Sequence, residues 1–360
     1  MKKVLCLIDT LDYGGGAERQ MAGLAGMLYG RGYEVVLATY HKHVMNPWLR
    51  EKYGMESVIL NCEESQWSKF KTVRRFIRTG NFDTVIAYKD GATMIACLCR
   101  MTGLKFKLIV SERNTSTSLN SHEKLKFFLY RFADFVVPNS NSQGKFIKDN
   151  IKHLTKKVHV ITNFTDLEAF SPNFNYALHD GIIHVLITAR IAPQKNIIPF
   201  MRVVRRLKEA NVNVRFDWYG GVYFGKEDYG KEVMCEYERL DISDYLHFYE
   251  PTNAISEKYK ECDAFCLPSL YEGYPNVVCE AMSSGKPILC SRVCDNPEIV
   301  EENRNGMMFN PIDEDEMFAV LRAFCNKSEE ELILMGRESR VIAEQKFSAN
   351  AFVDKYIQII

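Results

Sequence analysis

The stretch VLCLIDTLDYGGGAERQMAGLAGML, residues 4–28, indicates the fold of this chain. It opens with the apolar run Val4–Ile8, passes through a glycine-rich turn, and continues with apolar residues at helical spacing. The apolar run is too short for the core of a signal peptide, so we interpret it as a buried strand. A strand that leads through glycines into a helix is the first half of a βαβ unit, which predicts a parallel sheet.

This alternation of strand and helix continues to about residue 162 and begins again after the segment 163–181. The strands predicted in the first part are 3–8, 34–40, 57–60, 83–88, 107–111, 134–138 and 158–162. Those predicted after the segment 163–181 are 183–190, 213–219, 245–249, 263–267 and 287–290, with a helix over 197–210. We therefore predict an α/β protein of two doubly wound Rossmann-like domains, 1–165 and 166–345, whose strand ends face one cleft. Residues 346–360 are expected to form a closing helix.

The composition narrows the class of protein. The 360 residues contain no stretch of eighteen apolar residues, so no membrane-spanning helix is expected. The 11 cysteines accompany no secretion signal and suit a reduced cytoplasmic protein. The net charge is zero, but residues 1–165 carry 25 Lys and Arg against 14 Asp and Glu. Either the two halves attract each other, or the first half meets an anionic surface.

The glycine-rich turn does not match a dinucleotide fingerprint. Gly14 and Gly16 fit, but Arg19 stands where a third glycine is needed, and the second strand ends without an acidic residue. A nicotinamide or flavin cofactor is therefore not expected. Gly14, Gly15 and Gly16 could still bring backbone amides close to an anionic ligand, or they could form a plain tight turn.

Two cations follow the first strand of the second domain. Arg190 ends the predicted strand, and Lys195 comes just before the next helix. An arginine fork and a lysine point charge at the carboxyl end of a strand suit a diphosphate. Surface Arg and Lys are common, so the pair alone is a weak signal.

The stretch LPSLYEGYPNVVCEAMSSGKP, residues 267–287, places two carboxylates around a helix start. Pro275 suits the first helical position and Gly285 the stop, which would leave the amides of residues 276–278 to bind an anion. Glu272 precedes this helix, and Glu280 lies on its second turn. Glu280 could accept hydrogen bonds from a vicinal diol such as a ribose, or it could be a solvated helix residue.

Together, Arg190, Lys195 and the E-x7-E spacing of Glu272 and Glu280 resemble the retaining glycosyltransferases of family 4, which have the two-domain GT-B fold. The resemblance extends along almost the whole chain. Its other segments are GGGAER (14–19), VPNS (137–140), VITNFTDLEAF (160–170), KPILCS (286–291) and PEIV (297–300).

The resemblance implies a role for each matching residue. Glu280 would hold the ribose of a sugar nucleotide, Glu272 would contact the donor sugar, and Arg190 and Lys195 would bind the diphosphate. Backbone amides after Gly273, at Asn276 and Val277, and the glycines at 14–16 would complete the site. In such enzymes the anomeric configuration is retained, and the departing phosphate can take the acceptor proton. No cofactor and no metal ion are expected.

One segment departs from the family pattern. Many relatives carry a histidine in the first domain near the reacting carbon, whereas this chain reads IVSERNTSTS at 109–118. Such segments resemble those of members that use UDP-activated hexoses or N-acetylhexosamines. Glu112 and Arg113 are accordingly expected on the acceptor side of the substrate cleft.

The resulting hypothesis is a cytoplasmic, metal-independent, retaining glycosyltransferase. It would move a hexose or N-acetylhexosamine from a nucleotide sugar, with UDP favoured over GDP, to a growing bacterial surface glycan on a lipid carrier. Nucleic acid is not an expected partner. The alternatives are a nucleotide-sugar epimerase of the same fold and a two-lobed binding protein without chemistry.

Two other patterns admit a metal ion but favour simpler interpretations. The cysteines at 262, 266, 290 and 294 form C-x3-C pairs, which are looser than the usual zinc knuckles. Asp313, Glu314 and Asp315 match a D-x-D motif, but they directly precede an apolar helix, so we predict a helix cap.

Two basic segments of the first domain could meet a membrane surface. Residues 68–80 carry five cations and no acid, and residues 122–135 place Leu125, Phe128, Leu129 and Phe132 on one helical face. That face could instead pack into the domain core. An anionic leaflet would hold the cations without any spanning helix, which makes a peripheral location on the inner face of the membrane the expectation.

Overall fold

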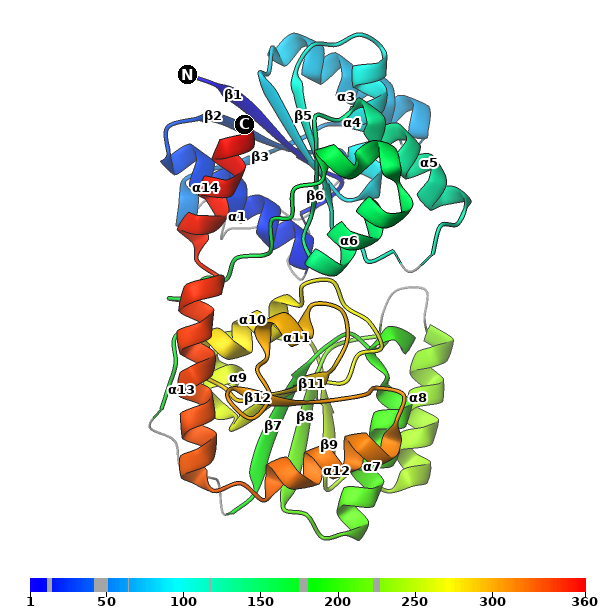
Figure 1. Cartoon of the computed structure of the whole chain (residues 1–360). Coiled ribbons are helices and arrows are strands. Elements are labelled where there is room, and N and C mark those ends of the chain that lie inside the picture. Colours follow the sequence, from blue (N-terminus) through cyan, green and yellow to red (C-terminus); the bar gives the residue numbers. More distant parts are fainter. Residues whose placement is uncertain (12–14, 42–50, 64, 117, 175–180, 223–226) are drawn as a thin grey trace. The chain divides into compact units, whose positions relative to one another are not determined.

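The chain folds into two compact α/β units in a computed structural model (Figure 1). The structure describes residues 1–11, 15–41, 51–63, 65–116, 118–174, 181–222 and 227–360. Met1–Asn163 and Asn350–Ile360 form the first unit, and Phe164–Ala349 form the second. The predicted two-domain, doubly wound fold is confirmed. The C-terminal segment belongs to the first unit.

The first unit is built on a six-stranded parallel sheet in the order β3-β2-β1-β4-β5-β6. Its strands are β1 (Lys3–Ile8), β2 (Glu34–Thr39), β3 (Ser57–Ile59), β4 (Thr84–Tyr88), β5 (Lys107–Glu112) and β6 (Phe135–Pro138). Its helices are α1 (Gly16–Gly30), α3 (Gln66–Gly80), α4 (Asp90–Met101), α5 (Ser121–Leu129), α6 (Asn141–Asn150) and α14 (Ala349–Ile359). Two 3₁₀ turns, η1 (Tyr130–Phe132) and η2 (Lys152–Lys157), complete it. The central strands are almost wholly apolar, as expected where helices cover both faces.

The second unit repeats this architecture with the order β12-β11-β10-β7-β8-β9. Its strands are β7 (Ile183–Thr188), β8 (Val214–Tyr219), β9 (Leu246–Tyr249), β10 (Ala264–Leu267), β11 (Ile288–Ser291) and β12 (Gly306–Phe309). Its helices are α7 (Ile197–Glu209), α8 (Glu227–Leu240), α9 (Ile255–Glu261), α10 (Asn276–Ser283), α11 (Asn296–Ile299), α12 (Glu314–Cys325) and α13 (Glu329–Lys346), with a 3₁₀ turn η3 (Pro193–Lys195). In both units the strand order reverses beside the first strand, which defines a topological switch point where ligands bind in such sheets.

Two strand predictions need correction. The segment 158–162 is not a strand: Val158 makes an isolated bridge to Val136, and the amides of His159 and Ile161 donate to β6. Conversely, β12 was not predicted, because its four residues GMMF contain no β-branched side chain. Among the described residues, no helix is long and apolar enough to cross a membrane.

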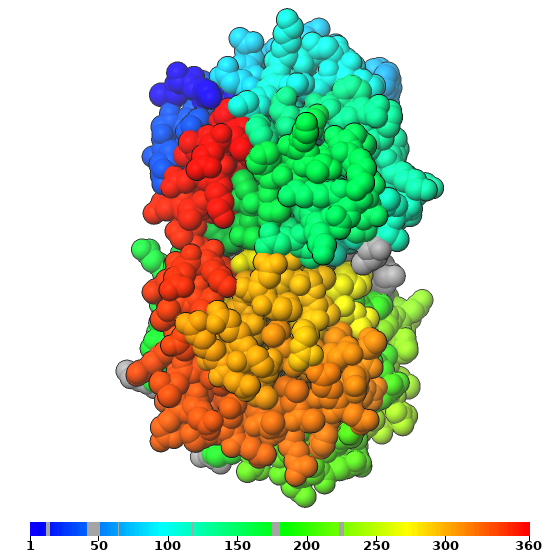
Figure 2. Space-filling model, viewed as in Figure 1, coloured from blue at the N-terminus to red at the C-terminus, as the bar shows by residue number. Residues whose placement is uncertain are grey.

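The C-terminal helix α14 packs on the first unit through a buried aromatic contact. The hydroxyls of Tyr356 and Tyr88 lie 2.8 Å apart, and both side chains are fully buried. At the surface, Arg31 pairs with Asp354 at 2.8 Å. Figure 2 shows this red C-terminal segment lying against blue N-terminal residues. The chain end therefore closes the core of the unit in which the chain begins.

This packing predicts a large stability effect at Tyr356. Replacing Tyr356 with Ala should lower the free energy of unfolding of the first unit by about 4 kcal/mol, because it leaves a cavity and an unpaired Tyr88 hydroxyl. Tyr356→Phe should cost about 1 kcal/mol. Urea unfolding measures both. The control is Tyr29→Ala, whose side chain is 53% exposed on α1; a loss at Tyr356 no larger than at Tyr29 would contradict the packing.

Candidate active site

Four of the side chains predicted to bind a donor follow the two strands at the switch point of the second unit, whereas the predicted glycines 14–16 belong to the first unit. β7 and β10 are parallel neighbours. From β7 the later strands β8 and β9 follow on one side of the sheet, and from β10 the later strands β11 and β12 follow on the other. Arg190 and Lys195 follow β7, whereas Glu272 and Glu280 follow β10. Because the carboxyl ends of parallel strands meet at one edge, the fold brings the two cations and the two carboxylates to the same edge of the sheet.

A close ion pair lies at the centre of this edge. Lys195 Nζ is 2.5 Å from Glu272 Oε1, and the two side chains are only 13% and 11% exposed. The sequence assigned these groups to different parts of one ligand. In the structure they are partners of each other, so a diphosphate that binds Lys195 must share it with Glu272 or displace Glu272.

The loops that carry this pair are tied together by Gln194. Its backbone oxygen accepts from the amide of Leu270 at 2.8 Å, and its side-chain amide donates to the carbonyl oxygen of Tyr271 at 2.8 Å. Asn196 then ends the turn η3 in a left-handed conformation, with φ 58°. These constraints fix the backbone on both sides of Lys195, which restricts where its ammonium group can lie.

Arg190 lies one residue beyond a tight contact between β7 and β8. The indole of Trp218 donates to the carbonyl oxygen of Ala189 at 2.7 Å, and a Cβ on Gly220 would lie 2.0 Å from that oxygen. Glycine is therefore required at position 220. The Arg190 side chain is exposed, so its guanidinium can reach a ligand at this edge.

Glu280 is a buried carboxylate, only 5% exposed, on α10. The hydroxyl of Tyr259 lies 3.4 Å from Glu280 Oε2, 3.1 Å from the carbonyl oxygen of Val277 and 3.1 Å from Thr188 Oγ1. Tyr259 thus connects the end of β7 to the first turn of α10 and supports Glu280 from α9. Sequence reasoning missed Tyr259, which appears there only as one aromatic residue in a polar helix.

The start of α10 differs by one position from the prediction. Pro275 is the N-cap residue rather than the first helical residue. Its carbonyl oxygen accepts from the amide of Val278 at 3.1 Å, so the prediction that this amide points out of the helix start is wrong. Gly273, Asn276 and Val277 lie half-buried around this turn.

The glycine-rich turn of the first unit leaves space for a side chain of the helix that follows it. Gly14 lies outside the described residues, Gly15 is the N-cap residue of α1, and Gly16 is its first residue. A Cβ on Gly15 would lie 1.9 Å from the carboxylate of Glu18. The glycine therefore makes room for a carboxylate at the helix N-terminus, which is a favourable place for negative charge.

Glu18 belongs to a second ion-pair cluster that the sequence reasoning missed. Lys89 Nζ lies 2.5 Å from Glu18 Oε1 and 3.2 Å from Asp9 Oδ1, and Lys89 has a positive φ of 66°. Asp9 follows β1 and Lys89 follows β4, so this cluster marks the switch point of the first sheet. The general rule for switch points could have identified it.

Glu112 and Arg113 are both engaged inside the first unit. Glu112 is fully buried, and its carboxylate lies 2.9 Å from Lys126 Nζ. Arg113 stacks over the ring of Tyr88 at 4.0 Å and donates to Asn163 Oδ1 at 2.6 Å. These contacts make the two side chains supports for the loop after β5.

The Lys126 ammonium group joins three carboxylates. Besides Glu112, it contacts Glu123 at 2.9 Å and Asp90 at 3.5 Å. Burial raises the pKa of Glu112 from its ordinary 4.5 to about 7, although Lys126 opposes the shift. Burial alone would lower the pKa of Lys126, but Glu112 and Asp90 raise it. With His122, Asp90 and Glu123 have metal-like spacing, but the Lys126 ammonium group already contacts both carboxylates, which disfavours a second cation there.

The other metal-like patterns have structural roles. Cys262, Cys266 and Cys290 are buried free thiols, and burial raises the pKa of Cys262 to about 12, which keeps it protonated. Cys294 is only partly buried, and among the described residues these four cysteines do not form a metal-binding group. The helix cap predicted at Asp313 is confirmed, because its carboxylate accepts from the amides of residues 315 and 316.

Comparison with known proteins relates most of the second unit to one family model. Residues 173–349 match the family model described as Glycosyl transferases group 1. The GalNAc-alpha-(1->4)-GalNAc-alpha-(1->3)-diNAcBac-PP-undecaprenol alpha-1,4-N-acetyl-D-galactosaminyltransferase of Campylobacter jejuni is 26% identical, over 87% of this chain and 86% of its own length. The amylovoran biosynthesis glycosyltransferase AmsD of Erwinia amylovora is 23% identical, over 84% of this chain and 85% of its own.

A solved structure shares the complete fold. HepE from Anabaena, crystallised with UDP-glucose, matches 100% of this chain and 100% of its own with a TM-score of 0.85 at 18% identity. At this identity the likeness shows the fold alone. The GT-B architecture and the match to the group 1 glycosyl transferase model are therefore the two findings on which a functional assignment can build.

The raised pKa of Glu112 predicts a pH effect on stability. The folded protein holds the Glu112 proton more tightly than the unfolded chain, so this group makes the free energy of unfolding fall as pH rises from about 4.5 to about 7. Relative to wild type, Glu112→Gln should therefore gain stability between pH 5 and pH 7.5. Urea midpoints at several pH values measure it. Glu63→Gln, at an exposed position, is the control, and a relative loss for Glu112→Gln would mean that Lys126 lowers the pKa.

Proposed function

Because residues 173–349 carry a glycosyltransferase group 1 domain, we propose that the chain is a retaining glycosyltransferase of family 4. It takes a hexose or N-acetylhexosamine from a UDP-sugar and transfers it to a growing bacterial glycan on a lipid carrier. The observation that carries this proposal is the arrangement at the β7–β10 edge. Support comes from the strand order: Arg190 and Lys195 follow β7, and Glu272 and Glu280 follow its parallel neighbour β10.

Arg190 and Lys195 bind the diphosphate of the donor. The guanidinium offers a planar pair of donors, and the ammonium group is a compact charge on a backbone fixed by Gln194. As the bond to the sugar breaks, negative charge accumulates on the leaving diphosphate. Preorganised cations that meet this charge lower the barrier more than they strengthen ground-state binding.

The two glutamates bind the two other parts of the donor, the ribose and the sugar. Glu280, buried and supported by Tyr259, accepts hydrogen bonds from the ribose hydroxyls. Glu272 contacts hydroxyls of the donor sugar once the diphosphate has drawn Lys195 away. The half-buried Gly273, Asn276 and Val277 at the start of α10 line the same side of the ligand.

Retention follows if the acceptor attacks on the face from which the diphosphate departs. The leaving phosphate oxygen then takes the acceptor proton, so the reaction needs no separate protein base. Arg190 and Lys195 supply the positive charge that a metal ion supplies in other transferases. The proposed enzyme is therefore independent of metal ions and has no cofactor.

The nucleotide and the acceptor are proposed by likeness. HepE was crystallised with UDP-glucose, and the Campylobacter relative is named for a lipid-linked, undecaprenol-bound acceptor. In the first unit, Glu112 and Arg113 support the loop after β5. Residue 114 of this loop is exposed and residue 115 is half-buried, so this loop can contact an acceptor. The relatives do not favour an epimerase or a binding protein. Incubating the protein with donor alone tests the first alternative, because only an epimerase would convert the donor into its epimer.

Removing either cation should abolish most of the activity while leaving the fold intact. Arg190→Ala and Lys195→Ala should each lower kcat by about a hundredfold, because one charge-assisted donor to the developing charge is lost. Steady-state kinetics with UDP-sugar and a lipid-linked acceptor measures this. Lys231→Ala, at an exposed position on α8, serves as the control.

Two further readouts accompany these assays. A chelator should leave the rate unchanged, and the product should keep the anomeric configuration of the donor. Near-normal kcat in both variants would remove the diphosphate assignment. A rate that EDTA abolishes and Mn²⁺ restores would contradict metal independence, and an inverted product would contradict retention.

We also propose that the first unit binds an anionic membrane surface, at which a lipid-linked acceptor would lie. On α3, Lys71, Arg75 and Arg78 are exposed, and Trp67 is 64% exposed. Leu125 and Phe128 of α5 are also exposed, so the interpretation that this face packs into the core is wrong for these two residues. It is confirmed for Leu129, which is buried in the core, and for Phe132, which packs against it. α4 lies between the two helices (Figure 1).

Two cations expected at this surface are buried instead. Lys126 lies among its carboxylates, and Lys69 packs over the ring of Tyr40 with its ammonium group 3.3 Å from His41 Nε2. The proposed membrane surface is therefore smaller than the sequence suggested. Its cations are those of α3 that point away from the sheet.

Vesicle binding should depend on these α3 cations. Replacing Lys71, Arg75 and Arg78 with Glu should weaken binding to anionic vesicles by at least a hundredfold, since each cation contributes about 1 kcal/mol. Lys145, Lys152 and Lys156, exposed elsewhere on the same unit, are changed to Glu as the matched control. Co-sedimentation at low and high salt measures binding. Equal binding to neutral vesicles, or equal loss in both triple variants, would contradict the proposal.

A further inference from the structure

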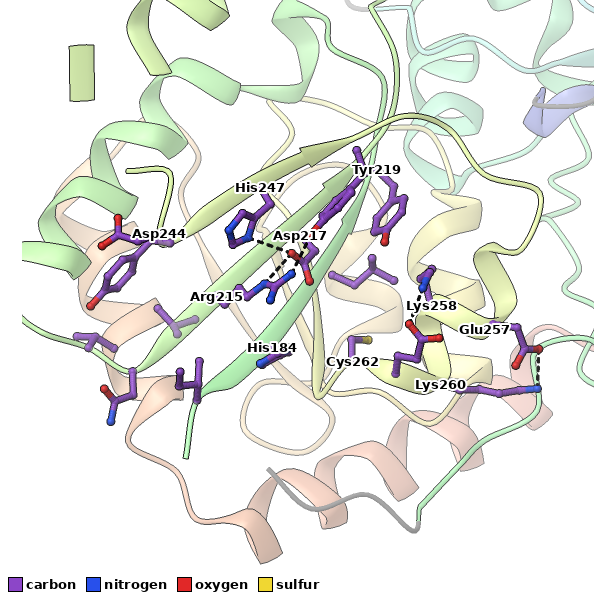
Figure 3. A pocket seen from close by; sticks show the side chains of 18 of the residues that line it. His184, Arg215, Asp217, Tyr219, Asp244, His247, Glu257, Lys258, Lys260 and Cys262 are labelled. Carbon is purple, nitrogen blue, oxygen red and sulfur yellow. Dashed lines mark hydrogen bonds and ion pairs between the residues drawn. The ribbon is translucent and has the colours of Figure 1, made fainter. Parts of the chain in front are cut away.

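One face of the second sheet is polar where a parallel sheet is usually covered. Along β8 the burial alternates: Val214, Phe216 and Trp218 are buried, while Arg215, Asp217 and Tyr219 face a groove and are half-buried (Figure 3). The groove runs over β7, β8 and β9 beside α9 and encloses about 1480 Å³. Parallel sheets normally bury both faces under apolar helices, so a hydroxyl-, carboxylate- and imidazole-lined face is unusual.

Most charged side chains in this groove lie close to a group of opposite sign. Arg215 Nε lies 3.0 Å from Asp217 Oδ1, and His247 Nδ1 lies 3.3 Å from the same oxygen. On α9, Lys258 and Lys260 pair with glutamates on their own helix at 2.6 and 2.9 Å. Cations that are already neutralised do not select a polyanion, which disfavours nucleic acid and anionic lipid as occupants.

A rigid aromatic pair stands among these polar groups. The rings of Tyr219 and Tyr249 are stacked, with centroids 4.7 Å apart and planes inclined by 15°. Arg215 Nη2 donates to the Tyr249 hydroxyl at 2.8 Å, which holds the second ring in place. Tyrosine rings fixed in this way offer an apolar surface with polar groups around it.

We propose that this groove binds an uncharged glycan chain, as a carbohydrate site additional to the donor site. An apolar helix would leave Asp217, His247 and Arg215 without solvent, and a charged polymer finds no unmatched charge. A glycan fits both features, because its ring CH groups can lie on the tyrosines while its hydroxyls exchange hydrogen bonds with the paired polar groups. The residues lining the groove do not include Arg190, Lys195, Glu272 or Glu280.

The choice of a glycan rests on the proposed function, since a glycosyltransferase that extends a chain gains from holding it at a second point. Binding at two points raises the local concentration of the chain end at the reacting site. Loss of the groove should therefore affect long acceptors and spare short ones. Donor affinity should stay unchanged, because the groove lies on the face of the sheet and the donor residues lie at its edge.

The test uses the full chain and two uncharged probes, maltotriose and α1,4-linked tri-N-acetylgalactosamine. Calorimetry measures each affinity with and without saturating UDP. At least one probe should bind wild type, and Tyr219→Ala combined with Tyr249→Ala should weaken it by at least about tenfold. Tyr249→Phe, which keeps the ring but loses the hydrogen bond from Arg215, should weaken binding less than the double alanine variant does. Tyr29→Ala, at an exposed position on α1, should bind as wild type does.

The outcomes separate this proposal from the donor assignment. An unchanged UDP affinity and an unchanged circular dichroism spectrum show that the double variant is folded. If neither probe binds wild type, or if the double variant binds as well as wild type, the groove is not a glycan site. A change of oligomeric state without a change in probe affinity would assign this face to self-association and overturn the proposal. Failure of UDP to bind wild type would contradict the donor site alone.

Discussion

The ion pair between Lys195 and Glu272 is the constraint on which the candidate site depends. Two opposite charges at 2.5 Å, mostly shielded from solvent, hold two loops from neighbouring strands in one arrangement. At about 4 Å and an effective dielectric constant of about 20, such a pair interacts by about 4 kcal/mol before desolvation is counted. A ligand diphosphate must offer Lys195 more than Glu272 does. Under the proposed function, an anionic donor can compete with Glu272 for Lys195, whereas a neutral sugar offers Lys195 no charge.

The two units solve the same structural problem in the same way. Each doubly wound sheet leaves a crevice where its strand order reverses, and in each a lysine and a glutamate meet there. In the first unit the pair is Lys89 and Glu18, with Asp9 beside them. Each edge carries two carboxylates, but the first has the one cation Lys89 beside Asp9 and Glu18, whereas the second has Arg190 and Lys195. Under the proposed function, the additional cation of the second unit would serve the anionic donor.

Local patterns predicted the elements well, and partners distant in sequence explain what they missed. In the described part of the chain, periodicity predicted eleven of the twelve strands and missed β12, which contains Gly306, whose Cβ would lie 2.2 Å from the Ile288 oxygen. The proposed donor residues came from motif spacing and the family resemblance. Lys126 looked like a surface cation because the carboxylates that bury it, at positions 90 and 112, lie on other elements. The polar groove could not be predicted either, because the alternation of apolar and polar residues along β8 does not indicate which face of the sheet a helix covers.

The most direct test of this account compares the affinity of free UDP for two conservative variants. Glu272→Gln removes the carboxylate that competes for Lys195, whereas Glu280→Gln removes the proposed ribose acceptor and leaves the Lys195 pair intact. The account predicts that Glu272→Gln binds UDP at least as tightly as wild type and that Glu280→Gln binds it about tenfold more weakly. Weaker binding by Glu272→Gln together with unchanged binding by Glu280→Gln would contradict it.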